Sequence, residues 1–327
     1  MFVGHALFAF AIAALVADWR GWDRRRALVV GAVAGAFATV PDVDVAYALV
    51  GLAAWNAADG VFAASTAFWD ASRAVHRSVT HSLVVGAIAA PAFGLLAVRD
   101  SRRAPLARTV GAGLLLALLA VALVDSPLAA VVMGLFAVSG ALVAVGAGRS
   151  TSLSPQTIAL AALWGLWSHP WGDLVTGSPP DWLYPFASPL LTSRILLHAD
   201  PTLHLLGAFA IELAVVWFAL AVGCRVTDRS LFGAVDRRAA VGVAYAVAPL
   251  AAAPPTLDVS YHFVFSILGV GLLSGVGPVV PSAAGRSRRP APSTADRALE
   301  IALTSVAAVT IALVAYLAVY LFVVAPA

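Results

Sequence analysis

The sequence lacks lysine, so all twenty basic residues are arginine, and it has a single cysteine among 327 residues. Only 11% of the residues are charged, whereas soluble domains average about 25%. No basic stripe interleaved with aromatic residues is present, which argues against nucleic acid as a partner. The lone Cys224 excludes an intramolecular disulfide and a thiolate metal cluster, so any metal would need histidine and carboxylate ligands.

What the sequence does contain is apolar, because 61% of its residues are hydrophobic. This composition indicates a polytopic membrane protein. A helix needs about 20 residues to cross the hydrocarbon core, and this criterion predicts an all-α transmembrane bundle of about ten spans. The expected spans are residues 3–18, 27–40, 81–98, 105–124, 127–147, 157–176, 204–223, 239–254, 260–280 and 298–324.

The arginines predict the orientation of these spans. No basic residue precedes the apolar stretch 3–17 and four arginines follow it, the reverse of a secretory signal, so we expect a retained first span. Basic residues gather in cytoplasmic loops. With the N-terminus outside, seventeen of the twenty arginines fall in inner loops, and the exceptions are Arg73, Arg77 and Arg194.

The longer connections differ in character. The outer connection 45–75 holds an apolar piece, Val45 to Trp55, that fits a half-span or an interfacial helix. The outer connection 177–203 is rich in proline and aromatic residues, as lids and interfacial elements often are. The inner loop 281–297 is rich in proline, serine and arginine and is the only linker-like stretch.

Polar residues that are costly in an apolar setting occur near the ends of four of the expected spans. On the predicted orientation they all fall at outer ends, so the topology brings them together. They are His5, Asp42 and Asp44 after Pro41, the stretch His76-Arg77-Ser78-Val79-Thr80-His81-Ser82, and the pair His169 and Asp173.

The spacing of these residues predicts how they can converge. His169 and Asp173 are four apart and project from one helical face. His76 and His81 are five apart, about 140° around a helix, so we expect His76 in a turn and His81 near a helix start capped by Ser78 or Thr80. Pro41 favours an extended backbone that would turn Asp42 and Asp44 toward one centre.

A set of carboxylates and imidazoles suits Zn, with Mn or Fe as alternatives. Two such ions about 3.5–4 Å apart would activate a water and stabilise both oxygens of a displacement, so hydrolysis is the favoured reaction class. The candidate ligands are His5, Asp42, Asp44, His76, His81, His169 and Asp173, with Asp44 and His76 also candidates for the general base. Arg77 could hold a phosphate or carboxylate in a bidentate manner, or it could be interfacial or structural.

Simpler interpretations apply to other polar residues. A single histidine at a membrane helix end is more often interfacial than a ligand, which is our interpretation of His198 and His262, while His204 stays open. Trp182 and Tyr184 fit an aromatic belt. Asp42 and Asp44, taken alone, could also be a helix stop.

These motifs resemble the YdjM-like family of inner-membrane metal-dependent hydrolases. The resemblance covers residues 1 to about 190 and rests on Gly4-His5, Pro41-Asp42-Val43-Asp44, His76-Arg77-Ser78-Val79-Thr80-His81-Ser82, Ser168-His169 with Asp173 and Thr176, and Trp182-Leu183-Tyr184-Pro185. Two departures concern local backbone geometry: Ser78 replaces the usual glycine, and the usual Trp-Pro is opened by two residues. The family implies metal-dependent hydrolysis.

A more distant similarity connects the order of these residues to the zinc-dependent phospholipase C and P1 nuclease group. That group carries a later His-x-x-x-Glu motif, whereas His204 here is followed by Ala208, and Glu212 lies eight residues on. The similarity therefore implies fewer metals in this chain.

Two functions follow as hypotheses. The first is a multi-pass hydrolase of the inner membrane, with residues 1–203 as the hydrolase-like core and 204–327 as additional spans. It would use a metal-bound hydroxide to cleave a phosphoester or related bond in a membrane lipid or lipid-like substrate on the non-cytoplasmic side. The alternative is a transporter or scaffold that uses the same polar residues as an ion site. No oligomeric partner follows from the sequence.

Overall fold

The structure, a computed structural model, describes residues 2–56, 60–73, 77, 79–100, 102–187, 190–277 and 293–325. Within these ranges all regular secondary structure is helical, which confirms the predicted all-α class. The chain divides into two compact units, Met1–Ile195 and Leu196–Ala327. The division into a hydrolase-like core ending at residue 203 and additional spans stays a prediction.

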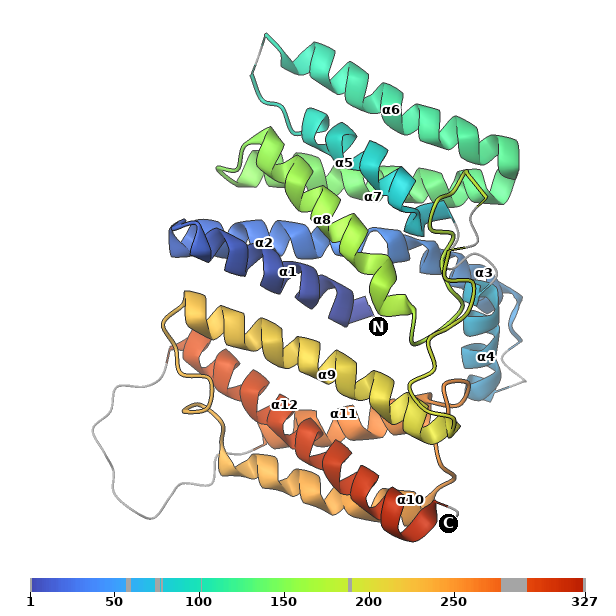
Figure 1. Cartoon of the computed structure of the whole chain (residues 1–327), viewed down its shortest axis with the longest axis vertical. Helices are drawn as coiled ribbons and strands as arrows, with labels where there is room; N and C mark the ends of the chain where they lie inside the picture. Colours follow the sequence, from blue (N-terminus) through green and yellow to red (C-terminus); the bar gives the residue numbers. More distant parts are fainter. Residues whose placement is uncertain are drawn as a thin grey trace. The chain divides into compact units, whose positions relative to one another are not determined.

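Unit 1 contains eight α-helices and two short 3-10 helices among its described residues (Figure 1). In chain order they are α1 (Phe2–Trp19), α2 (Arg24–Ala38), η1 (Pro41–Tyr47), α3 (Ala48–Ala54), α4 (Gly60–Arg73), η3 (Val79–His81), α5 (Leu83–Leu96), α6 (Ala104–Asp125), α7 (Pro127–Ser150) and α8 (Pro155–Asp173).

Serine side chains start three of these helices. Ser126 and Ser154 cap α7 and α8 by accepting backbone N–H bonds, and a proline with no N–H to satisfy occupies the first turn of each. Ser82 caps α5 and accepts from the amides of Val84 and Val85. The prediction that Thr80 or Ser78 caps this helix was therefore wrong: α5 begins three residues after Thr80 with Ser82 as its cap, and Ser78 lies outside the described residues.

Helix α8 is central to unit 1 because it packs against α1, α2 and α5. Behind it, α2, α5 and α7 meet through three fully buried rings: the centroid of Phe93 lies 5.5 Å from that of Phe37 and 6.0 Å from that of Phe136. Buried alanines, Ala34 and Ala38 among them, let the helix backbones approach closely, as is usual between membrane helices.

The helices of unit 1 run back and forth, so their connections fall at two opposite ends (Figure 1). The connections after α1, α5 and α7 lie at one end and carry the arginine-rich stretches 20–26 and 99–103. The start of α1, η1, η3 and the end of α8 lie at the other end. The described polar residues singled out by the sequence that could bind a metal belong to this second end: His5, Asp42, Asp44, His81, His169 and Asp173.

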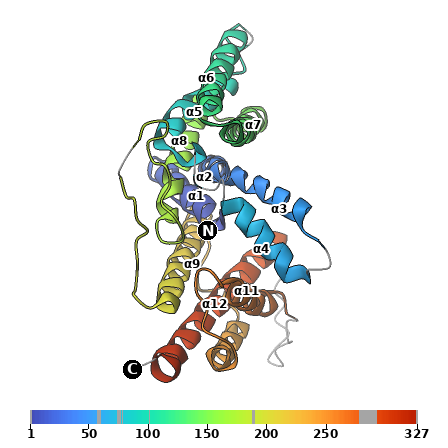
Figure 2. The same ribbon diagram turned by 90° about the vertical axis from the view of Figure 1, so that its right-hand side faces the viewer.

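The segment after α2 differs from the prediction. We expected an extended backbone at Pro41, but residues Pro41–Tyr47 form the 3-10 helix η1, and the preceding Val40 is also helical. The helix axis bends by 43° between α2 and the segment Pro41–Ala54. Helices α3 and α4 then lie side by side as a helical hairpin (Figure 2), where the sequence predicted a half-span or an interfacial helix.

Unit 2 consists of α9 (Pro201–Val226), η4 (Arg237–Val247), α10 (Ala248–Ala251), α11 (Tyr261–Val276), α12 (Thr294–Val319) and a terminal π-helical turn, η5 (Tyr320–Val324). Its core joins α9, α11 and α12 through Leu206, Phe263, Ile267, Leu313 and Tyr316. On its arginine-bearing side, Arg238 pairs with Asp236 at 2.9 Å and Glu300 at 3.2 Å.

Four described helices are long and apolar enough to cross a membrane: α6, α7, α9 and the segment Thr294–Val324. The bent pair of α2 with Pro41–Ala54 makes a fifth if it counts as one span, and α1, α5 and α11 are shorter apolar helices. Large apolar side chains such as Leu116, Val124 and Leu142 are exposed on α6 and α7, as lipid-facing surfaces require. The length and apolar composition of these helices thus identify the chain as a membrane protein.

Candidate metal site

Four side-chain atoms from three separate elements converge at the second end of unit 1. The Nε2 atoms of His81 and His169 lie 3.1 Å apart. Asp42 Oδ1 lies 3.4 Å from His169 Nε2 and 3.7 Å from His81 Nε2. Asp173 Oδ2 lies 3.5 Å from His81 Nε2 and 3.6 Å from His169 Nε2. We call these four residues the His/Asp cluster.

The His/Asp cluster is buried. His81, His169 and Asp173 expose 1% or less of their surface, and the Asp42 side chain exposes 7%. The carboxylate atoms Asp42 Oδ2 and Asp173 Oδ2 have no hydrogen-bond partner among the described residues. Buried carboxylate oxygens without partners are costly, and a bound cation would remove that cost.

The spacing of the cluster suits a divalent ion. Bonds of about 2.0–2.2 Å from a tetrahedral ion to nitrogen and oxygen ligands place neighbouring ligand atoms about 3.3–3.6 Å apart. The five distances in the cluster that involve an imidazole nitrogen, 3.1 to 3.7 Å, bracket this range. Two histidine nitrogens and two carboxylate oxygens are also a donor set that zinc, manganese and iron accept.

The hydrogen bonds of His169 fix which ring nitrogen faces the cluster. Its Nδ1 lies 2.7 Å from the carbonyl oxygen of Ala38 at the end of α2. Because a carbonyl oxygen only accepts, Nδ1 carries a hydrogen, and in the neutral ring the lone pair of Nε2 is directed into the cluster. A second interaction of this kind behind a ligating histidine is a common feature of metal sites.

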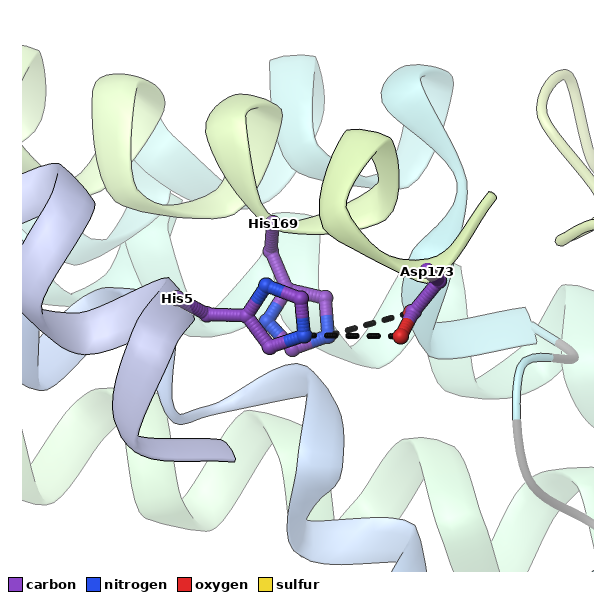
Figure 3. A group of neighbouring side chains, drawn as sticks. All are labelled: His5, His169 and Asp173. Carbon is purple, nitrogen blue, oxygen red and sulfur yellow. Dashed lines mark ion pairs between the residues drawn. The ribbon is translucent and has the colours of Figure 1, made fainter. Parts of the chain in front are cut away.

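His5 approaches the same place from α1 (Figure 3). Its Nε2 lies 3.4 Å from Asp173 Oδ1, and its ring centroid is 4.0 Å from that of His169. Ligand atoms of His5, His169 and Asp173 all lie within 4.8 Å of one another, as do those of Asp42, His81 and His169. His169 thus belongs to two overlapping groups that could each hold an ion.

Asp44 lies behind His81. It is fully buried, and its Oδ2 is 3.7 Å from His81 Nδ1 and accepts hydrogen bonds from Thr80 Oγ1 at 3.4 Å and from the Arg77 amide at 3.2 Å. In a 3-10 helix each residue advances by about 120°, so Asp42 and Asp44 face different directions. Asp44 therefore faces Nδ1 of His81, which points away from the cluster, and Asp42 faces Nε2, which points into it.

Two further residues were predicted for the site. Arg77 is at the cluster, with Nη2 2.9 Å from Asp173 Oδ1. His76 lies outside the described residues. His198, His204 and His262 belong to unit 2, and the buried His204 accepts a hydrogen bond from the Leu197 amide.

Sequence reasoning missed two glycines that make room for the site. A Cβ on Gly172 would lie 2.5 Å from Cε1 and 2.7 Å from Nδ1 of His5, and a Cβ on Gly177 would overlap the guanidinium of Arg77. It also considered Thr80 only as a helix cap, whereas Thr80 Oγ1 lies 3.0 Å from His81 Nδ1. The available signal was position: Gly172 directly precedes the candidate ligand Asp173, where a glycine indicates close approach of another group.

Comparison with known proteins agrees with the motifs. A family model described as YdjM inner membrane protein matches residues 1–253, which extends beyond the motif-bearing stretch that ends near residue 190. Neither curated proteins nor solved structures gave a match. The family match covers most of the 327 residues, and it includes every residue of the His/Asp cluster. The chain therefore belongs to the YdjM inner membrane protein family.

Proposed function

We propose that the chain is a membrane-embedded, metal-dependent hydrolase that cleaves a phosphoester or related bond in a lipid-like substrate. The observation that supports this most directly is the His/Asp cluster: two imidazole nitrogens 3.1 Å apart, each with a carboxylate oxygen of Asp42 and of Asp173 at 3.4 to 3.7 Å, buried at one end of unit 1. Such a donor set is costly to bury without a cation.

In this proposal His81, His169, Asp42 and Asp173 hold the ion, which is zinc or, alternatively, manganese or iron. A bound divalent ion supplies a Lewis acid that polarises a phosphoryl oxygen and lowers the pKa of a water. The Ala38 carbonyl and Asp44 orient the two imidazoles from behind. His5 lies on the opposite oxygen of Asp173 and is a further ligand candidate or a proton carrier.

The proposed orientation places the site on the non-cytoplasmic side of the inner membrane. The arginine-rich connections lie at the opposite end of unit 1 from the His/Asp cluster (Figure 1), and arginines favour the cytoplasmic side. This arrangement supports the proposal of an outer N-terminus, and the count of about ten spans is part of the same proposal. Trp171 in the last turn of α8 and Phe186 in the connection that follows it expose 54% and 66% of their surface, as residues at a membrane interface often do. A lipid-like substrate could therefore reach the site from the outer leaflet.

The test is metal analysis of the purified protein combined with a phosphoester and lipid hydrolysis panel. Wild type should retain a divalent ion and hydrolyse at least one substrate, and the His81→Ala and Asp173→Ala variants should lose both. Equal and negligible metal in all three proteins would overturn the proposal. Metal binding without hydrolysis, together with transport that depends on His81, would favour an ion-dependent transporter instead.

A further inference from the structure

Arg77 lies in the connection between α4 and η3, and its guanidinium makes four polar contacts with unit 1. Its Nη1 donates to the carbonyl oxygens of Asp173 at 3.3 Å and Ser178 at 3.2 Å. Its Nη2 donates to Thr176 Oγ1 at 3.0 Å and lies 2.9 Å from Asp173 Oδ1. The guanidinium therefore joins the last turn of α8 to the segment that follows it.

These contacts leave little of the guanidinium for a ligand. The Arg77 side chain exposes only 11% of its surface, and its two terminal nitrogens already face four protein acceptors. The third nitrogen, Nε, has no hydrogen-bond partner among the described residues, but it is buried. A residue that grips a substrate phosphate needs donors directed into open space. The guanidinium is therefore arranged for contacts within the protein.

Within the His/Asp cluster, Arg77 pairs with one side-chain oxygen, Asp173 Oδ1. Asp173 Oδ1 faces Arg77 and His5, whereas Asp173 Oδ2 has no hydrogen-bond partner among the described residues and faces the two cluster histidines. Since Asp173 is 1% exposed, the pairing at Oδ1 fixes the carboxylate rotation. That rotation determines that Oδ2 points at His81 and His169.

The backbone around Arg77 is shaped for this contact. Its φ of 70° lies in the left-handed region, which non-glycine residues rarely adopt, and its amide and carbonyl bond to Asp44 Oδ2 and the Asp181 amide. On the opposite side, any side chain on Gly177 would occupy the space of the guanidinium. A strained backbone and a matching gap indicate that this placement is required.

We propose that Arg77 is a positioning residue that orients Asp173 as a metal ligand, and that it does not bind the substrate. This inference rests on the metal site proposed above. Residues that orient ligands from outside a metal site typically change metal affinity by about 10–100-fold when replaced.

The experiment measures zinc affinity by chelator competition and the visible spectrum of the cobalt-substituted full-length protein. Arg77→Gln should weaken zinc binding by about 10–100-fold and change the cobalt spectrum. Arg77→Lys should fall between Gln and wild type, because an ammonium keeps the charge but not the planar fork. Gly177→Ala should act in the same direction by displacing an unaltered Arg77. The matched control is Arg194→Gln, which removes an exposed arginine from the connection after α8 and should change neither readout.

Three outcomes would overturn the inference, and they differ from one another. A folded Arg77→Gln protein with wild-type zinc affinity and an unchanged cobalt spectrum shows that Arg77 does not position Asp173. The same protein with unchanged zinc affinity but weakened binding of inorganic phosphate shows a substrate clamp. Wild type without affinity for zinc, manganese or iron removes the metal site itself, and with it the proposed function. Gel filtration and thermal unfolding of the metal-free variants separate loss of fold from loss of affinity, and Gly177→Ala and Arg77→Lys are the milder changes if Arg77→Gln does not fold.

Discussion

His81 and His169 direct their Nε2 atoms at each other across 3.1 Å, from a 3-10 turn and from the last turns of α8. The Ala38 carbonyl accepts a hydrogen from Nδ1 of His169 on the opposite side of the ring, so in the neutral ring a lone pair faces His81. Two imidazole nitrogens at this distance need a proton or a cation between them. The two carboxylates beside them favour a cation.

Replacing His169 tests the centre of the site, because it belongs to both groups of candidate ligands. His169→Ala should abolish stoichiometric zinc binding, measured by elemental analysis after dialysis. The matched control is His204→Ala, a buried histidine of unit 2 outside the cluster. Equal zinc loss in both variants would show that binding does not depend on this cluster.

The two aspartates of η1 should differ in their effect. Asp42→Asn removes a carboxylate that faces both histidines and should lower zinc affinity by more than 100-fold. Asp44→Asn alters only the group behind His81 and should cost about 10–100-fold. Isothermal titration of both metal-free variants checks the order. A larger effect at Asp44 would mean that Asp44, which faces His81 Nδ1 at 3.7 Å, is the ligand.

Gly172 should be intolerant of even a methyl group. Gly172→Ala places a Cβ against the ring of His5, so the ring must move and zinc affinity should fall severalfold. Gly146→Ala in α7 is the control, since its Cβ would meet nothing within 4 Å. In a helix this change stabilises by about 0.5–1 kcal/mol. Thermal unfolding and zinc affinity of both variants provide the comparison, and an unaffected Gly172→Ala protein would place His5 outside the site.

The orientation can be measured with two matched cysteines. In a Cys224→Ser background, Ser193→Cys lies in the connection after α8 and Ser152→Cys in the connection between α7 and α8, and both positions are exposed. A membrane-impermeant maleimide added to intact spheroplasts should label position 193 and not 152. The reverse pattern would place the site end of unit 1 on the cytoplasmic side.

Much of the fold followed from the sequence because each apolar run needs a helix to satisfy its backbone. All ten predicted spans contain helical residues, although length and composition support four or five crossings, so the full count stays a prediction. The convergence of His5, Asp42, His81, His169 and Asp173 followed from one argument, that polar residues at the same ends of antiparallel spans meet.

Local backbone geometry was the part that the sequence did not reveal. Pro41 predicted an extended turn, yet the chain stays helical there, because the bend and the packing of η1 against α7 override the local preference of a residue before proline. The position of Asp44 behind His81 follows from that 3-10 geometry. The roles of Gly172 and Gly177 depend on what lies opposite them, which no local pattern contains.

The site draws His5 and Asp173 from positions about 170 residues apart. At synthesis rates of about 5–20 residues per second, Asp173 emerges on the order of ten to thirty seconds after His5. During that interval the nascent chain holds an incomplete set of donors that cannot surround an ion. For the proposed metal site, ion acquisition would therefore follow synthesis and insertion of α8, and loading would depend on the metal supply that the finished unit encounters and not on that at the ribosome.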